Sequence, residues 1–343
     1  MEDIRISVVI PLYSGADHVT RALDNLDRQD CGFPFEVIVV DDCSTDDSAN
    51  IVCEYISKLK RADSFRLIRS PQNGRAGAAR NIGVREARGH YILFNDQDDY
   101  PDTKLLRVLW ENSDEGRVDL VSCAVSDRNG EPYYRPECSA SEEIGEEKRR
   151  AFVRDYGYAF ASLIKKSIIT ENNIFFPEKV MFEDCLYNVG IVACADTIQT
   201  IRDVLYYREN DQTSQTASFT AKKLNDRISA VLIYLESFRG NSKIMRYSQD
   251  VKLLAFYYVY LSCMLWLLAI PGLYTKELFD RCLREGRAIG ASWDDVFRYE
   301  KRFSGKTLRM LKMIYDHPAM AYPARLCGTT AYKVLKKVRN RNR

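Results

Sequence analysis

Short apolar runs alternate with amphipathic segments along the first 125 residues of the chain. Runs rich in β-branched residues are typical of buried strands, and they occur at residues 5–10, 35–40, 65–68, 90–95 and 118–125. Apolar residues at helical spacing predict helices between them, at Val19 to Leu26, 51–59, 76–88 and 102–112. Strands separated by helices predict βαβ units, a mostly parallel sheet and helices on both of its faces.

The segments that follow the first four strands are all polar or turn-forming. They read PLYSG, DDCSTDD, RSPQNGRAG and NDQDD. In a parallel sheet, ligands bind outside the carboxyl ends of the strands. We therefore expect these four segments to meet at one edge of the sheet and to form a binding site.

Two familiar nucleotide sites are excluded by their missing glycines. A dinucleotide site needs G-x-G-x-x-G after the first strand, whereas this chain has Pro11-Leu12-Tyr13-Ser14-Gly15. The SGKT at 304–307 lacks the leading glycine of a phosphate-binding loop, because Glu300 stands there, and no predicted strand precedes it. An NAD-dependent oxidoreductase and a P-loop enzyme are both disfavoured.

Three carboxylates crowd the end of the fourth strand, in YILFNDQDDYP. Mg²⁺ is typically held by one or two carboxylates together with substrate phosphates, and Asp96 and Asp98 offer that arrangement. Such a cation neutralises charge on a departing diphosphate. The alternative is that Asp98 or Asp99 caps a helix near Pro101, which explains one acid but not three.

Four ordered blocks resemble family 2 glycosyltransferases of the GT-A fold. They are ISVVIPLYSGADHVTRALDNLDRQD, FEVIVVDDCSTDDS, NGRAGAARNIGVREARGHYILFNDQDDY and FEDCLYN, and together they cover roughly residues 4–210. The resemblance implies an α/β GT-A domain at 1–216, with nucleotide-sugar binding in 1–125 and the acceptor side in 126–216. A helical region would follow at 217–343.

The resemblance also implies how the nucleotide is bound. Pro11 and Tyr13 would line the base, the tyrosine with its ring face, and Asp42 would accept a hydrogen bond from the base. Arg75 or Arg80 would meet the nucleotide or its phosphates. Each has a structural alternative: Tyr13 fills a turn, Asp42 caps the next helix, and Arg80 pairs with an acid on a neighbouring loop.

In the same comparison, Asp96 and Asp98 would form a D-x-D site for Mn²⁺ or Mg²⁺. Asp99 would hydrogen-bond the donor sugar or stiffen the loop. Asn95 and Gln97 depart from the Leu and Ser that the family often has there, without blocking the flanking acids.

A second acidic pair, Glu183 and Asp184, opens a predicted helix in FPEKVMFEDCLYNVGIV. In members of the family with this pair, the Asp is the general base that deprotonates an acceptor hydroxyl, and we expect Asp184 to do so, with Glu183 as the substitute base or as its orienter. One displacement inverts the anomeric configuration. The alternative is that the two acids simply favour a helix N-terminus.

The segments around this pair give weaker signals. Residues 131–150 are interpreted as an acceptor-side loop that leads into a helix. Phe160 stands where the family often has Trp, and either stacks on an acceptor sugar or packs in the core. Arg208, in the segment 204–216, resembles a phosphate contact of the family; its alternative is a surface salt bridge.

The C-terminal part is helical by pattern and carries a basic end. Residues 253–275 contain no charge, which admits a membrane span, but four tyrosines and a Pro-Gly favour a buried or interfacial helix. Between His317 and Arg343 there are seven Lys or Arg residues and no acid, and KVLKKVRNRNR is amphipathic. This tail predicts peripheral contact with an anionic membrane; the alternative is a frayed end. Nucleic acid is not an expected partner.

Composition agrees with an ordinary globular chain. The 343 residues are 46% hydrophobic and 29% charged. Ten cysteines without C-x-x-C spacing favour reduced thiols, and the acidic first residues favour a strand over a signal peptide. We expect a cytoplasmic protein at the inner face of the cell membrane.

Two functions remain from this reading. The first is an inverting, metal-dependent hexosyl- or N-acetylhexosaminyltransferase that moves sugar from a nucleotide-diphosphate donor, commonly a UDP-sugar in this family, to a glycan or lipid-linked hydroxyl in cell-surface polysaccharide synthesis. The second is a catalytically silent nucleotide-sugar-binding or scaffold protein of the same fold. Intact Asp96, Asp98 and Asp184 argue against the second.

Overall fold

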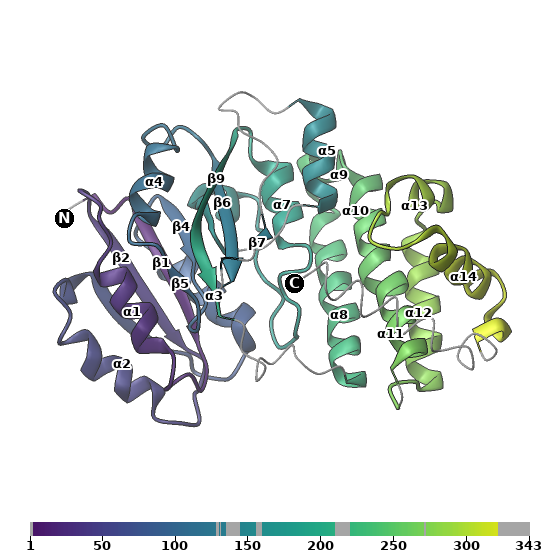
Figure 1. Ribbon diagram of the computed structural model, residues 1–343, viewed down its shortest axis with the longest axis horizontal. Coiled ribbons are helices and arrows are strands. Elements are labelled where there is room, and N and C mark those ends of the chain that lie inside the picture. The colour runs from purple at the N-terminus through teal and green to yellow at the C-terminus, as the bar shows by residue number, and fades with distance from the viewer. Residues whose placement is uncertain are drawn as a thin grey trace.

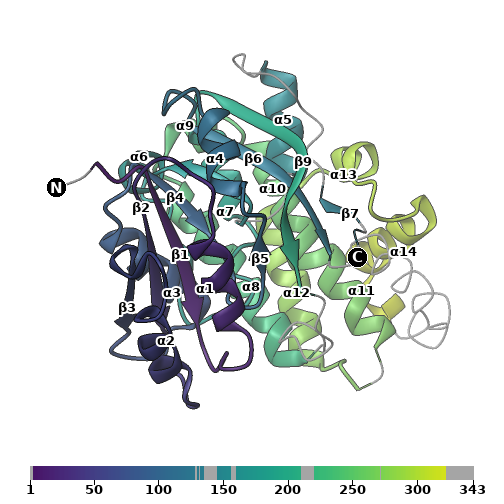
Figure 2. The same cartoon turned by 60° about the vertical axis from the view of Figure 1, so that its left-hand side comes forward.

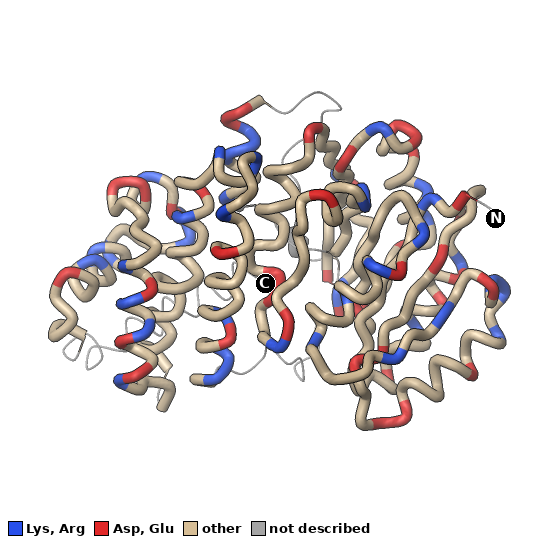
Figure 3. Tube along the Cα trace, turned by 180° about the vertical axis from the view of Figure 1, so that it is seen from behind, with Lys and Arg blue, Asp and Glu red and all other residues tan. Residues whose placement is uncertain are grey.

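A computed structural model describes residues 3–127, 130, 132–134, 145–155, 160–209, 220–270 and 272–321. A sheet flanked by helices forms one half of the molecule and a group of helices forms the other (Figure 1). The predicted basic tail at 329–343 and most of the loop at 131–150 lie outside the described residues. Lysine, arginine, aspartate and glutamate are interspersed along both halves (Figure 3).

Within the described residues, nine strands form one mixed sheet, in the order β3-β2-β1-β4-β8-β6-β9-β5, with β7 paired to β6. The first four are parallel, as the sequence predicts. Strand β8 then runs antiparallel between β4 and β6. The strands are β1 (Ile6–Leu12), β2 (Phe35–Asp41), β3 (Phe65–Arg69), β4 (Tyr91–Phe94), β5 (Tyr100–Pro101), β6 (Leu120–Asp127), β7 (Pro132–Tyr134), β8 (Ser162–Lys165) and β9 (Ile198–Arg208).

Helices cover both faces of the sheet, because alternate strand residues supply two separate apolar surfaces. One buried cluster joins Val8 and Val39 to helices α1, α2 and α4, and the other joins Val9 and Val40 to α3, α6 and α7. These helices are α1 (Val19–Asp27), α2 (Ser48–Ile56), α3 (Arg75–Glu86), α4 (Leu105–Glu111), α5 (Glu146–Asp155), α6 (Lys166–Glu171) and α7 (Tyr187–Cys194), with a 3₁₀ turn η1 at Ala62–Ser64.

The C-terminal region is helical, as expected. Its elements are α8 (Ala221–Phe238), α9 (Ser242–Met245), α10 (Ser248–Phe256), the π-helical turn η2 (Tyr257–Leu261), α11 (Ser262–Ala269), α12 (Lys276–Ile289), α13 (Trp293–Tyr299), α14 (Gly305–Asp316) and the 3₁₀ turn η3 (Pro318–Met320). The SGKT segment belongs to a helix start, since the Ser304 hydroxyl accepts a hydrogen bond from the Thr307 amide at 3.2 Å.

The longest apolar helix lies inside this region. Ser248–Ala269 is long and apolar enough to cross a membrane, but 83% of its most apolar window is buried within the protein. Its residues belong to the same buried cluster as Val9, Phe94 and Leu311. The sheet and the helical region therefore share one hydrophobic core, and Figure 2 shows α8 beside the sheet.

Gly286 allows α12 to lie directly against the buried Tyr260. A Cβ at position 286 would lie 2.9 Å from the Cβ of Tyr260, whose hydroxyl is held by the carbonyl of Leu311 at 2.7 Å. We expect Gly286→Val to lower the free energy of unfolding by about 1–3 kcal/mol through overpacking. Urea titration followed by circular dichroism measures the change. Gly240→Ala is the control, because nothing lies within 4 Å of its added Cβ, and an equal loss in both variants would contradict the packing argument.

Candidate active site

The loops after β1, β2 and β4 meet at the carboxyl edge of the sheet, as predicted. The Gln97 side chain bridges two of them: it accepts from the Tyr13 amide at 2.8 Å and donates to the Tyr13 carbonyl at 3.3 Å. The Asp42 amide donates to the Leu12 carbonyl at 2.8 Å. Ser14 and Cys43 have φ values of 46° and 59°, which is the kind of backbone strain found at functional sites.

Asp42, the residue after β2, lies at this edge of the sheet, and only one of its two carboxylate oxygens is hydrogen-bonded within the described part of the chain. Its Oδ1 accepts from the Gly74 amide at 2.8 Å, while Oδ2 is buried without a hydrogen-bond partner in the described part of the chain. Burial raises the pKa of the carboxyl, and the charge of Arg75 acts in the opposite direction. Helix α2 starts instead after Asp47, so Asp42 is no helix cap.

The two other residues predicted to meet the base, Pro11 and Tyr13, lie at the end of the first strand and just after it. Pro11 is buried within β1, and the Tyr13 side chain beyond its end is 37% exposed. Arg75 begins α3 with a φ of 68° and is partly buried. The structure thus brings Tyr13, Asp42 and Arg75 to the same edge.

The loop after β4 holds its three aspartates in different surroundings. Asp99 is buried and accepts from the Tyr206 hydroxyl at 3.0 Å and from the Glu209 amide at 3.0 Å. The same hydroxyl accepts from the Asp96 amide at 3.1 Å. Asp98 is partly buried. Strand β5 follows, and α4 begins only at Leu105, so these acids cap no helix.

Negative charge is strongly concentrated in this loop. Burial, and then the charge of Asp96, raises the pKa of Asp98. Burial and the charges of Asp96 and Asp98 raise the pKa of Asp99 well above its usual range. Arg208, at the end of β9, opposes both shifts and lies over the Phe160 ring at 5.6 Å. Phe160 is itself buried and stacked on Tyr206 at 5.2 Å.

The aspartate loop fits a divalent cation shared with a ligand. In the described residues, no group of three or more His, Cys, Asp or Glu side chains is arranged to hold a metal alone. Mg²⁺ commonly takes only one or two carboxylates and completes its shell with phosphate oxygens and water. A cation at Asp96 and Asp98 would also offset the repulsion that raises the pKa of Asp98.

Arg80 connects this loop to the second acidic pair. Its Nη2 donates to Asp96 Oδ1 at 2.7 Å and its Nη1 donates to Glu183 Oε1 at 2.5 Å. Burial lowers the pKa of the guanidinium, but the two carboxylates raise it above its usual range. The structural alternative for Arg80, pairing with acids on neighbouring loops, is therefore seen directly.

Glu183 and Asp184 lie in a turn, which we call the base turn (Val180–Leu186). Helix α7 begins only at Tyr187, so the prediction that the two acids open the helix is wrong. The Glu183 carbonyl accepts from the Tyr234 hydroxyl of α8 at 2.7 Å, and Phe182 has a φ of 62°. Burial, and then the charge of Glu183, raises the pKa of Asp184 to about 6, while Arg80 lowers it.

Sequence reasoning missed several residues that build this edge. Arg21, on α1, donates to the Asp98 carbonyl at 2.7 Å and pairs with Glu209 at 2.7 Å. Arg227, on α8, lies over the Phe182 ring at 5.3 Å. No periodicity marks such contacts, because each joins segments far apart in sequence. Tyr206 lies in the segment 204–216 that the sequence analysis singles out, but its two hydrogen bonds require the folded sheet.

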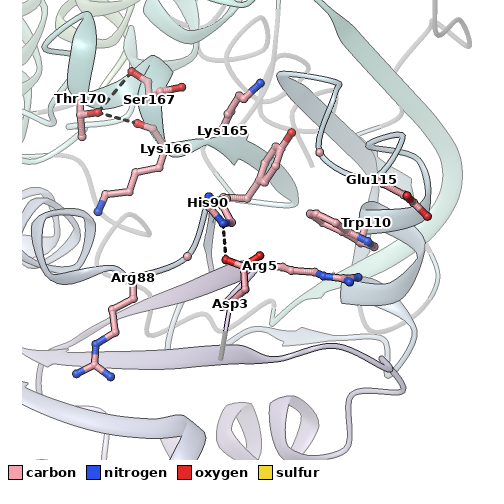
Figure 4. A pocket seen from close by; sticks show the side chains of 13 residues that line it. Asp3, Arg5, Arg88, His90, Trp110, Glu115, Lys165, Lys166, Ser167 and Thr170 are labelled. Carbon is pink, nitrogen blue, oxygen red and sulfur yellow. Dashed lines mark hydrogen bonds and ion pairs between the residues drawn. The ribbon is translucent and has the colours of Figure 1, made fainter. Parts of the chain in front are cut away.

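A separate cavity of about 710 Å³ lies at the opposite, amino-terminal edge of the sheet. Its side chains include Arg5, Arg88, His90 and Lys166, and His90 pairs there with Asp3 at 2.7 Å (Figure 4). No residue predicted for the nucleotide, the metal or the base lines this cavity. The candidate active site is therefore the carboxyl edge.

The mixed sheet, the aspartate loop and the helical region define a GT-A-like fold. In structural comparison, the chain resembles TarS residues 1–349 from S. aureus, crystallised with UDP-GlcNAc, with a TM-score of 0.68 and 21% identity over 98% of this chain and 92% of that one. Residues 7–171 match the glycosyl transferase family 2 model, which identifies this part of the chain as a family 2 glycosyltransferase domain.

Two curated relatives are similar in sequence. The poly(ribitol-phosphate) beta-N-acetylglucosaminyltransferase TarS of Staphylococcus aureus is 30% identical over 60% of this chain and 35% of its own length. The uncharacterized glycosyltransferase EpsJ of Bacillus subtilis is 30% identical over 60% of this chain and 61% of its own. The chain thus spans about a third and about three fifths of these relatives.

The raised pKa of Asp184 predicts an acid limb in the pH profile of any reaction that uses it as a base. Only the deprotonated carboxylate accepts a proton, so the rate should rise with pH through about 6 and then level off. Glu183→Gln removes a charge that raises this pKa, and the midpoint should move to lower pH. Release of UDP from a UDP-sugar, measured between pH 4.5 and 8 (about the range in which such a carboxyl titrates), checks both. A midpoint that stays in place in Glu183→Gln would contradict the assignment.

Proposed function

We propose that this protein is an inverting, metal-dependent glycosyltransferase. It moves a sugar from a nucleotide-diphosphate donor, a UDP-sugar in our proposal, to a hydroxyl of a glycan or lipid-linked acceptor in cell-surface polysaccharide synthesis. The observation that carries the proposal is the meeting of the aspartate loop with the base turn at one edge of the sheet, joined through Arg80.

The donor half follows from the groups at that edge. Tyr13 offers a ring and Asp42 an unpaired carboxylate oxygen to the nucleotide base. Arg75 and Arg208 supply positive charge for the phosphates. Asp96 and Asp98 hold the Mn²⁺ or Mg²⁺, which when bound offsets charge on the departing diphosphate. Asp99, fixed by Tyr206, keeps the loop in shape.

The acceptor half centres on Asp184. A carboxylate with a pKa of about 6 is mostly deprotonated at pH 7 and still basic enough to take a proton from an attacking hydroxyl. Attack from the side opposite the diphosphate inverts the anomeric carbon. The similar TarS is named a beta-N-acetylglucosaminyltransferase and was crystallised with UDP-GlcNAc, which supports a UDP-sugar donor.

A catalytically silent binding protein is the second candidate. A protein that only bound nucleotide sugar would not need a carboxyl held near pKa 6 beside the metal loop. Peripheral contact with the inner face of the membrane through residues 329–343, in the cytoplasm, remains part of the proposal, and it suits a lipid-linked acceptor.

The donor site is tested by binding of UDP, GDP, CDP, dTDP and NAD, each with and without Mn²⁺, using titration calorimetry. We expect one nucleoside diphosphate, UDP, to bind at least about tenfold more tightly with the metal, and Asp98→Ala to remove that gain because half of the carboxylate pair is gone. Asp203→Ala is the control, since Asp203 is exposed on β9. Metal-independent binding in the wild type would refute the metal site.

The base is tested separately by Asp184→Asn. UDP affinity in the presence of Mn²⁺ should stay within about threefold, while release of UDP from UDP-GlcNAc or UDP-glucose should fall by about 10²- to 10⁴-fold, the usual contribution of a general base. Asp203→Asn is the matched control. Full turnover in Asp184→Asn would show that another group takes the proton.

A further inference from the structure

Helix α3 lies between the two halves of the active site and contacts both. At its N-terminus, the Gly74 amide donates to Asp42 at 2.8 Å, and the Gly74 carbonyl accepts from the Lys179 amide at 2.8 Å. At its middle, the Asn81 side chain exchanges hydrogen bonds with the backbone of Phe176, both at 2.9 Å. The helix is therefore fixed to the segment that leads into the base turn.

This contact is unusually close. A Cβ at Gly77 would lie 2.3 Å from the Pro177 carbonyl oxygen and 3.3 Å from Glu183 Cβ, so only glycine admits this approach. The close approach brings the Arg80 side chain, one turn further along, between Asp96 and Glu183. Its guanidinium lies over the Phe176 ring at 5.3 Å, and the side chain is 8% exposed.

The two terminal nitrogens of Arg80 donate hydrogen bonds to carboxylates on two different loops. Nη2 bonds Asp96 of the aspartate loop and Nη1 bonds Glu183 of the base turn. The Nε atom is buried without a hydrogen-bond partner among the residues that the structure describes. A planar fork of fixed width thus sets the separation of the two carboxylates.

We propose that Arg80 is a positioning residue of the transfer reaction: its guanidinium holds Glu183, and with it the neighbouring base Asp184, at a fixed place relative to the metal-binding Asp96. The inference rests on the proposed function, because it assigns Arg80 a part in the same site. It differs from the expectation that Arg80 contacts the nucleotide or its phosphates, and it gives a catalytic purpose to the alternative, pairing with an acid on a neighbouring loop.

The bond from Tyr234 to the Glu183 carbonyl fixes the main chain of the turn from the other side. The direction of the Glu183 side chain is then set by its ion pair with Arg80. Lysine carries the same charge on a single nitrogen, which cannot reproduce two divergent hydrogen bonds in one plane. Arg80→Lys therefore keeps the positive charge at this site and removes the pair of hydrogen bonds that positions Glu183.

The experiment compares Arg80→Lys, Glu183→Ala, Glu183→Gln and the double variant Arg80→Lys/Glu183→Ala with wild type. Calorimetry measures UDP affinity in Mn²⁺, and UDP release from UDP-GlcNAc or UDP-glucose gives kcat and KM. Thermal unfolding verifies that each variant is folded. Arg85→Lys is the matched control, because Arg85 is exposed on the same helix and lies over the Phe175 ring at 5.0 Å.

Arg80→Lys and Glu183→Ala should each lower kcat by about 10- to 100-fold, as expected for a misplaced catalytic group, with UDP affinity within about threefold. Glu183→Gln, which keeps an oxygen acceptor for Nη1 but loses the charge of the pair, should lower kcat less than Glu183→Ala does, each measured at its plateau pH. The kcat of the double variant should be no lower than that of the less active single variant, because Arg80→Lys and Glu183→Ala break the same contact.

Three results would overturn the inference. They are an unchanged kcat in Arg80→Lys, effects of Arg80→Lys and Glu183→Ala that multiply in the double variant, or a loss of UDP affinity that matches the loss of turnover. The last would make Arg80 a donor-binding residue. If Arg80→Lys fails to fold, Glu183→Ala against Glu183→Gln decides alone: equal kcat in the two would refute the link. A wild type that neither binds UDP with Mn²⁺ nor releases UDP would instead overturn the proposed function itself.

Discussion

Like charge crowded at one edge of the sheet is the constraint on which the site depends. Asp96, Asp98 and Asp99 lie within four consecutive positions, and the fold brings Glu183 and Asp184 toward the same edge. Such a group of half-buried carboxylates is stable only when each finds a hydrogen bond, a positive partner or a raised pKa. All three forms of compensation occur at this edge. The Tyr206 hydroxyl donates a hydrogen bond to Asp99, Arg80 forms ion pairs with Asp96 and Glu183, and the pKa values of Asp98 and Asp184 are raised.

Asp98 and Asp184 both have raised pKa values, and they are the acids to which our proposal assigns the cation and the proton of the acceptor hydroxyl. The helical region holds the base turn in place through side chains of α8. Tyr234 holds the base turn by its main chain, and the buried Arg227 lies over Phe182, Tyr258 and Trp266 at 5.3, 4.6 and 4.6 Å. The turn keeps its left-handed residue because both sides are braced.

Much of this architecture is accessible from sequence because parallel strands and their helices have strong local signatures. The β-branched runs at 5–10 and 35–40 become β1 and β2 with small changes at their ends, and the acidic loop falls at the expected edge. The antiparallel insertion of β8 has no such signature, since four residues can pair in either direction. The two-residue β5 exists only through its partner β9. The Arg80 bridge joins positions 103 residues apart in the chain, and only tertiary structure brings them together.

The Tyr234 hydroxyl donates a hydrogen bond to the main-chain carbonyl of Glu183 in the base turn, so this contact does not depend on the side chain at position 183. The brace from the helical region and the bridge from α3 are chemically independent for that reason. A substitution at position 183 therefore leaves the main chain of the turn held by Tyr234, and loss of the Tyr234 hydroxyl leaves the bond between Arg80 and the Glu183 carboxylate in place.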